Sequence, residues 1–259
     1  MAEMIITRKR LLPGGACLRS IQRIVECYNV SPISAPGSQP QMATLLDQPA
    51  RSADNPAILA AIRDPDCNLA IWQRRAFADF TPLTGGTPND LRFTSDPDGL
   101  PAILAEALAA NGFAGDAALH GALAEDAAQL AHLFCDGMDL ATFELRLEVV
   151  RTDSCRKFHA DYVTARLITT YVGEGTQWLD DADADRVAAG GEPQRINRLA
   201  PFDVGLFKGK LSAERPAIHR SPPIIGTDGG ARLLLVLNPA SRSFVESRQS
   251  PLPPPVHLP

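Results

Sequence analysis

The sequence has few cysteines and no long hydrophobic run, and both features narrow the class of protein. Its five cysteines among 259 residues are odd in number and form no C-x-x-C pair, which argues against a disulfide framework and a four-thiolate zinc site. No stretch approaches the roughly 18 consecutive apolar residues of a transmembrane helix. The segment after the basic residues 8–10 is too short and broken for a signal peptide. We therefore expect a cytoplasmic protein with no membrane partner.

The sequence also lacks any excess of positive charge. A formal net charge of −5 gives no overall attraction to nucleic acid, so we expect no nucleic-acid partner. Apolar residues make up 45% of the chain and charged residues 21%, which is typical of a globular protein. No phosphate loop and no Ser/His/Asp nucleophile motif is present.

Composition divides the chain into three parts. Residues 1–50 contain a helix-like pattern followed by a Pro- and Ser-rich linker, and we predict a flexible N-terminal extension. Residues 51–245 are predicted to form a single globular domain. Residues 246–259 end in a proline-rich run and are predicted to be disordered.

Helices are predicted mainly in the first half of the globular domain. The Ala- and Leu-rich residues 100–110 and 117–135 keep a 3.6-residue apolar period. Residues 54–63 predict a shorter helix, with Asp54 or Ser52 as its N-cap. We expect these segments to form a helical cover over about residues 51–140.

Strands are predicted mainly in the second half. Residues 143–151 alternate apolar and charged side chains, as a half-buried strand does. Segments rich in apolar, β-branched or aromatic residues predict further strands at 69–73, 163–172, 176–179, 202–211, 216–219 and 232–237. Residues 82–98 and 180–194 are predicted to be loops. The predicted fold class is α+β, with a β-barrel core over about residues 141–240.

A His-x-Asp pair, His159 and Asp161, lies between two of the predicted strands. In an extended chain their side chains point the same way, with Cα atoms about 6.6 Å apart, so both can reach one ion. His219, 60 positions after His159, precedes another predicted strand. Two histidines and one carboxylate are the ligands of non-haem Fe(II) oxygenases, and zinc accepts the same ligands. Both histidines could instead be ordinary core residues.

Three stretches resemble the core of Fe(II)/2-oxoglutarate-dependent oxygenases: HADYVTARLITTYVGEGTQWL, FKGKLSAERPAIHRSPPI and GGARLLLVLN. The resemblance implies a double-stranded β-helix (jelly-roll or cupin-like) core, with Fe(II) and 2-oxoglutarate as cofactors. It also implies a basic residue that binds the far carboxylate of 2-oxoglutarate, a role that Arg232, 13 positions after His219, matches. Tyr171 is a second predicted cofactor contact, although core packing is the alternative. We expect residues 82–98 and 180–200 to contact a substrate, small molecule or protein, whose identity the sequence does not encode.

The phrases CRKFHADYVTARLITTYVGEGTQW and HRSPP also resemble a family of bacterial proteins of unknown function, whose members often accompany GTPases of metal homeostasis. That resemblance implies an alternative, a non-catalytic zinc-binding protein that partners a metal-chaperone GTPase. Cys155 could then be a fourth ligand if the chain bends. Two further alternatives are open: a metal-dependent hydrolase or isomerase on a cupin-like barrel, and an Arg232 that simply pairs with Glu144 or Glu148.

Overall fold

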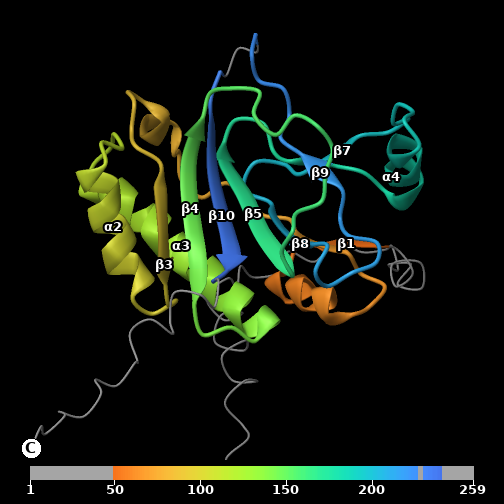
Figure 1. Cartoon of the computed structure of the whole chain (residues 1–259). Helices are drawn as coiled ribbons and strands as arrows, with labels where there is room; N and C mark the ends of the chain where they lie inside the picture. The colour runs from red at the N-terminus through yellow and green to blue at the C-terminus, as the bar shows by residue number, and fades with distance from the viewer. Residues whose placement is uncertain (1–48, 227–229, 241–259) are drawn as a thin grey trace, which may run out of the picture. The chain divides into compact units, whose positions relative to one another are not determined.

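The computed structural model of the chain describes residues 49–226 and 230–240 (Figure 1). The chain divides into two compact units, Met1–Pro40 and Gln41–Pro259, and every described residue belongs to the second. The predicted N-terminal extension, apart from residues 49 and 50, and the predicted disordered tail lie outside the described residues. No helix in the described ranges is both long and apolar enough to span a bilayer.

Two β-sheets of unequal size organise this unit. The larger sheet has seven strands in the order β1-β2-β8-β5-β10-β4-β3, and the smaller has three in the order β7-β6-β9. Only β1 and β2 are parallel, and every other neighbouring pair is antiparallel. The bounds are β1 Ala50–Ala53, β2 Leu69–Trp72, β3 Leu91–Ser95, β4 Phe143–Val150, β5 Ala165–Val172, β6 Gln177–Trp178, β7 Asn197–Arg198, β8 Val204–Lys208, β9 His219–Arg220 and β10 Arg232–Pro239.

The helices α2 (Leu100–Ala110) and α3 (Ala117–Met138) share one hydrophobic core with the larger sheet. Figure 1 shows α3 passing behind the sheet near β3 and β4, with α2 to the left of β3. The core joins apolar side chains of both helices to those of β4, β5, β8 and β10, among them Leu104, Leu123, Phe134, Leu145, Leu167, Leu206 and Leu235. The remaining helical elements are the 3₁₀ helices η1 (Pro56–Arg63) and η2 (Thr81–Thr84) and the helix α4 (Asp181–Ala188).

The opposite face of the larger sheet carries both polar and apolar side chains. Because side chains alternate along a strand, Leu167 and Tyr171 of β5 belong to the helical core while Arg166 and Thr170 point the other way. A second, smaller apolar cluster fills part of this face, formed by Leu69, Ile71, Ile168, Leu199, Phe207 and Ala217. Trp178 of β6, in the smaller sheet, packs against it. The space between the two sheets is thus part apolar and part polar.

The mixed α and β content expected from the sequence is confirmed, and several elements agree closely. The helix predicted at 100–110 coincides with α2, and the strand predicted at 143–151 differs from β4 by one residue. The N-cap prediction for the short helix was wrong. Asn55, rather than Asp54 or Ser52, accepts the N–H of Ala57 at 2.8 Å.

Two predicted loops contain regular structure. Residues 82–98 include β3, which pairs with β4 through Leu91 and Phe93. The surrounding Gly, Pro and Asp residues obscured this short alternation. Residues 180–194 include α4, whose acidic first turn follows an N-cap at Asp180 that accepts the N–H of Asp183 at 2.9 Å. Acidic residues favour a helix N-terminus because they complement its dipole.

The predicted division into a helical cover before residue 140 and a β core after it also needs correction. Strands β1, β2 and β3 precede that boundary and belong to the larger sheet, where β2 pairs with β8 and β3 with β4. These pairings join residues far apart in the sequence, which local periodicity does not predict. The described part of the chain therefore builds its main sheet from both halves.

Candidate metal centre

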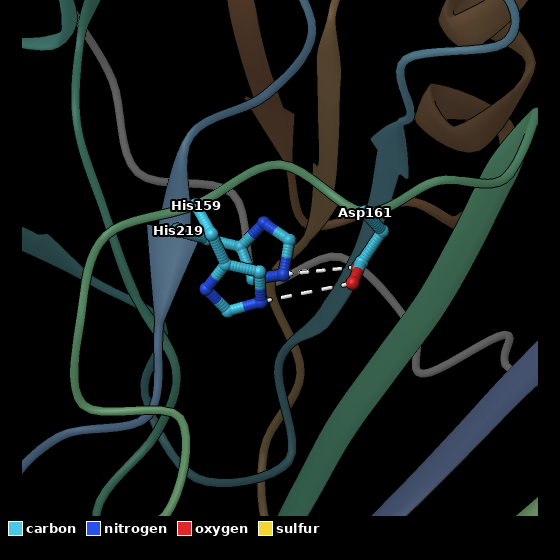
Figure 2. A group of neighbouring side chains, drawn as sticks. All are labelled: His159, Asp161 and His219. Carbon is cyan, nitrogen blue, oxygen red and sulfur yellow. Dashed lines mark ion pairs between the residues drawn. The ribbon is translucent and has the colours of Figure 1, made fainter. Parts of the chain in front are cut away.

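His159, Asp161 and His219 converge on one point, as Figure 2 shows. One ligand atom from each lies within 4.8 Å of the others. Nε2 of His159 is 3.7 Å from Oδ1 of Asp161, and Nε2 of His219 is 3.1 Å from Oδ2. The side chains of His219 and Asp161 are 5% and 10% exposed, whereas that of His159 is 36% exposed. The group is therefore buried on one side and open toward solvent at His159.

Backbone hydrogen bonds bring the two histidines together. The N–H of His159 donates to the carbonyl of His219 at 3.0 Å, and the N–H of His219 donates back at 2.9 Å. His219 is also paired with Trp178 in the smaller sheet. An exchange of two hydrogen bonds is the pattern of an antiparallel bridge, so the imidazoles emerge from neighbouring backbones, with ring centroids 4.8 Å apart.

A close loop contact holds Asp161. The carbonyl of Asp161 accepts the N–H of Lys210 at 2.9 Å, beside Gly209. A Cβ atom at Gly209 would lie 2.1 Å from the carbonyl oxygen of Val163 and 2.9 Å from that of Asp161. Only glycine permits such a close approach, so this residue is required for the position of the carboxylate.

The hydrogen bonds at the other ring nitrogens fix which nitrogen of each histidine faces Asp161. Nδ1 of His159 lies 2.9 Å from the carbonyl of Lys157, and Nδ1 of His219 lies 3.1 Å from that of Ala217. A carbonyl only accepts, so both Nδ1 atoms carry hydrogen, and in the neutral rings Nε2 offers a lone pair. This is the second contact that metal-binding histidines characteristically make.

A cation suits this arrangement better than the bare side chains do. Oδ2 of Asp161 is buried and, despite the 3.1 Å to Nε2 of His219, forms no hydrogen bond of acceptable geometry with the described residues. Two neutral imidazole lone pairs aimed at a carboxylate repel it, and a buried acceptor without a partner costs about 1–3 kcal/mol. A metal ion between the three groups removes both costs.

The charge state of Asp161 is also suited to a metal. Burial raises the pKa of Asp161, but the proximity of His159 and His219 and the charge of Arg166 outweigh burial and hold the pKa of this carboxyl below its usual range. The contact with Asp161 raises the pKa of His159. An ionised carboxylate is therefore present at neutral pH.

Arg232 is the second charged group between the sheets, and it is almost completely buried, with 1% of its surface exposed. Its guanidinium donates to the hydroxyl of Ser221 at 2.9 Å, to the hydroxyls of Thr170 at 3.1 Å and Thr176 at 3.4 Å, and to the carbonyl of Glu174 at 2.5 Å. Burial lowers the pKa of Arg232 to about 10. It is therefore still charged at neutral pH.

Arg232 has no carboxylate partner among the residues that the structure describes. The expected alternative, a pair with Glu144 or Glu148, is wrong, because Glu144 pairs with Arg92 at 3.0 Å and Glu148 pairs with Arg146. A buried charge that only neutral groups surround is costly. Arg232 is thus a buried cation whose described hydrogen-bond partners are all uncharged groups.

Two predicted site residues lie elsewhere. Tyr171, predicted as a cofactor contact, points into the helical core, where its hydroxyl donates to Asp126 of α3 at 2.6 Å. Its neighbour Thr170 occupies the site face instead, because side chains alternate along β5. Cys155 is exposed, with φ of 57°, and within the described ranges the group of possible metal ligands does not include it. Among the described residues, the ligand group thus contains no thiol.

Sequence reasoning missed the residues that support these groups. Arg166 donates to Oδ1 of Asp161 at 2.6 Å, and Ser221 and Thr170 contact Arg232. Ser221 lies two positions after His219, so the parity rule that linked His159 to Asp161 could have found it. The expected roles of residues 82–98 and 180–200 toward a substrate stay predictions.

Comparisons with known proteins agree with the sequence resemblances. Residues 53–238 match the family described as "Protein of unknown function (DUF1826)". No curated protein matches the chain.

Similar solved structures include several oxygenases. They include the 2-oxoglutarate complex of the dioxygenase for auxin oxidation 1 from Arabidopsis thaliana, at 8% identity over 74% of this chain and 91% of that one, with a TM-score of 0.39. A Pseudomonas putida prolyl-4-hydroxylase is 13% identical over 72% and 94%, with a TM-score of 0.38. Neurospora crassa T7H in complex with alpha-KG is 14% identical over 71% and 76%, with a TM-score of 0.36. TM-scores this low do not assign a shared fold, so the function depends on the geometry of this chain.

Proposed function

The chain belongs to the DUF1826 family of proteins of unknown function, and we propose that it is a metal-dependent oxygenase of the Fe(II)/2-oxoglutarate type. His159, Asp161 and His219 are the proposed metal ligands, and Arg232 binds the far carboxylate of the cosubstrate. In this proposal the two facing sheets are the halves of a double-stranded β-helix, with α2 and α3 as the helical layer behind the larger one.

One observation supports the proposal: the three-ligand group and a buried arginine, which has no carboxylate partner among the described residues, are linked through the short segment from His219 to Ser221. Ser221, which touches Arg232 at 2.9 Å, is two residues from His219. In an extended segment these Cα atoms are about 6.6 Å apart on the same side of the chain. In the proposal a ligand with two acidic ends spans this segment, with one end at the metal and the other at Arg232.

The protein residues have separable roles in this reaction. Fe(II) together with 2-oxoglutarate, when bound, supplies the activation of dioxygen and the oxidation of a C–H bond. His159, Asp161 and His219 would hold the ion through two imidazole nitrogens and a carboxylate oxygen. Arg232, with Ser221 beside it, orients the cosubstrate by a charge-assisted hydrogen bond. The apolar cluster around Phe207, whose ring centroid lies 4.7 Å from that of His219, limits the access of water.

The test is anaerobic titration of the Fe(II)-loaded protein with 2-oxoglutarate, followed by an assay of oxygen-dependent succinate formation. Arg232→Ala is expected to weaken 2-oxoglutarate binding at least about 30-fold, since truncating one partner of a buried charge pair costs about 2 kcal/mol or more. Asp161→Ala is expected to abolish metal binding and succinate formation together.

The matched control is Arg220→Ala. Arg220 adjoins His219 but donates to Gln177 at 2.7 Å and lies over the ring of Phe158 at 4.2 Å. Its removal should leave 2-oxoglutarate affinity within about twofold of wild type, since it does not touch the proposed site. Absence of succinate, with 2-oxoglutarate binding unchanged in Arg232→Ala, would refute the proposal.

A further inference from the structure

Arg166 connects the proposed metal ligand Asp161 to the larger sheet. Its Nη1 donates to Oδ1 of Asp161 at 2.6 Å, and its Nε donates to Oδ1 of Asn238 at 2.7 Å. Asn238 is itself buried and donates to Glu144 at 3.2 Å. A chain of three hydrogen bonds thus runs from the carboxylate through β5 and β10 to β4.

This series of hydrogen bonds makes the two oxygens of Asp161 inequivalent. Oδ1 is committed to Arg166, whereas Oδ2 is buried with no hydrogen bond of acceptable geometry from a described residue and lies 3.1 Å from Nε2 of His219. A guanidinium is a planar donor whose geometry fixes the acceptor in both direction and distance. Oδ2, which accepts no such hydrogen bond, is therefore the oxygen better suited to bind an ion.

We propose that Arg166 is a positioning residue, which restricts Asp161 to binding the metal through one oxygen and so keeps a further coordination position open. The inference rests on the metal site of the proposed function. Asn238 anchors Arg166, because its Oδ1 accepts the Nε–H of Arg166 and so fixes the orientation of the guanidinium group.

Two opposing effects of Arg166 can be separated experimentally. Its positive charge repels a cation, so its loss would by itself tighten metal binding. Its hydrogen bond orients Asp161, and the loss of such an outer-shell partner typically weakens metal affinity about 10- to 100-fold. Asn238→Ala changes no charge, and its effect therefore reports orientation alone.

The experiment measures Co²⁺ affinity and the Co²⁺ absorption spectrum of the full chain, with far-UV circular dichroism to verify that each variant is folded. Arg166→Gln is expected to weaken Co²⁺ binding about 10- to 100-fold and to alter the spectrum, since Asp161 can then bind through both oxygens. Asn238→Ala should also weaken Co²⁺ binding, by a smaller factor, and should alter the spectrum in the same direction. The matched control is Arg146→Gln, since Arg146 lies on β4, separated from β5 by β10, and pairs with Glu148. The Co²⁺ affinity of this variant should stay within about twofold of wild type.

The outcomes separate the inference from the function on which it rests. A wild-type chain that binds no Co²⁺ would overturn the metal site itself. Wild-type binding with tighter binding by Arg166→Gln would show that Arg166 acts only as a repelling charge, and the inference would fail alone. If Co²⁺ affinity and spectrum were unchanged in both Arg166→Gln and Asn238→Ala, the inference would also fail, while the metal site would stand.

Discussion

The hydroxyl of Tyr171 tests whether this face of β5 stabilises the core or contacts the cofactor. Tyr171 is 3% exposed, and its hydroxyl donates at 2.6 Å to Asp126, which also accepts two hydrogen bonds from Arg74. Burial, with the charge of Asp126, raises the pKa of Tyr171 well above its ordinary value, so the hydroxyl remains a donor. The side chain thus belongs to a buried polar network that ties α3 to the sheet.

The change Tyr171→Phe removes that hydroxyl and little else. The ring keeps its edge-on contacts with Phe80 and Phe202, whose centroids lie 5.2 and 5.6 Å away. A hydrogen bond to a charged group contributes about 1.5–3 kcal/mol, and we expect the free energy of unfolding to fall by that amount. For a unit of this size each kcal/mol lowers the melting temperature by about 2–4 °C. Metal affinity and 2-oxoglutarate affinity should both be unchanged.

The assay is urea unfolding followed by circular dichroism, with metal and 2-oxoglutarate titrations of the same preparations. The control is Tyr162→Phe, because Tyr162 is 78% exposed and a surface substitution of this kind shifts stability by no more than about 0.5 kcal/mol. A Tyr171→Phe variant of wild-type stability with weakened 2-oxoglutarate binding would refute the assignment of Tyr171 to the core and restore the role predicted from the sequence.

Three further predictions follow from single contacts. Gly209→Ala should weaken Co²⁺ binding by at least about tenfold, because the new Cβ displaces the Asp161 loop. The control is Gly121→Ala, which has nothing within 4 Å of its Cβ and should stabilise helix α3 by about 0.5–1 kcal/mol. Asp183 accepts two backbone N–H groups, which hold its pKa below the usual range; its stabilisation is present above about pH 4 and disappears as the pH falls through the lowered folded pKa. The stability deficit of Asp183→Asn, measured by urea unfolding, should therefore shrink as the pH falls below 4, and a constant deficit would contradict this. Saturating Co²⁺ at about 100 times its Kd should stabilise the wild type by about 2.7 kcal/mol, and EDTA or His219→Ala should abolish the effect in thermal unfolding.

Local periodicity predicted much of this structure because it needs only neighbouring residues. Alternation along the chain placed His159 and Asp161 on one side, and the helical period located α2 and most of α3. Where composition concealed the period, prediction failed: β3 lies among Gly, Pro and Asp residues, and the acidic α4 has few apolar positions. The N-cap Asn55 was missed, because three of the four residues 52–55 have side chains that can cap a helix.

Periodicity predicts that Thr170 and Tyr171 face opposite ways, but it does not say which one faces the site. That choice depends on what covers each face of the larger sheet, and here α3 covers the Tyr171 side. The same reason explains why Arg166 was missed, since its contact with Asn238 depends on the pairing of β5 with β10 across about 70 residues of sequence. The two arginines that matter both lie on the site face of these paired strands: Arg166 holds the ligand Asp161, and Arg232 reaches Thr170 four residues further along β5. Strand pairing thus sets the separation between Asp161, held by one arginine, and Thr170, contacted by the other, and local periodicity does not predict that separation.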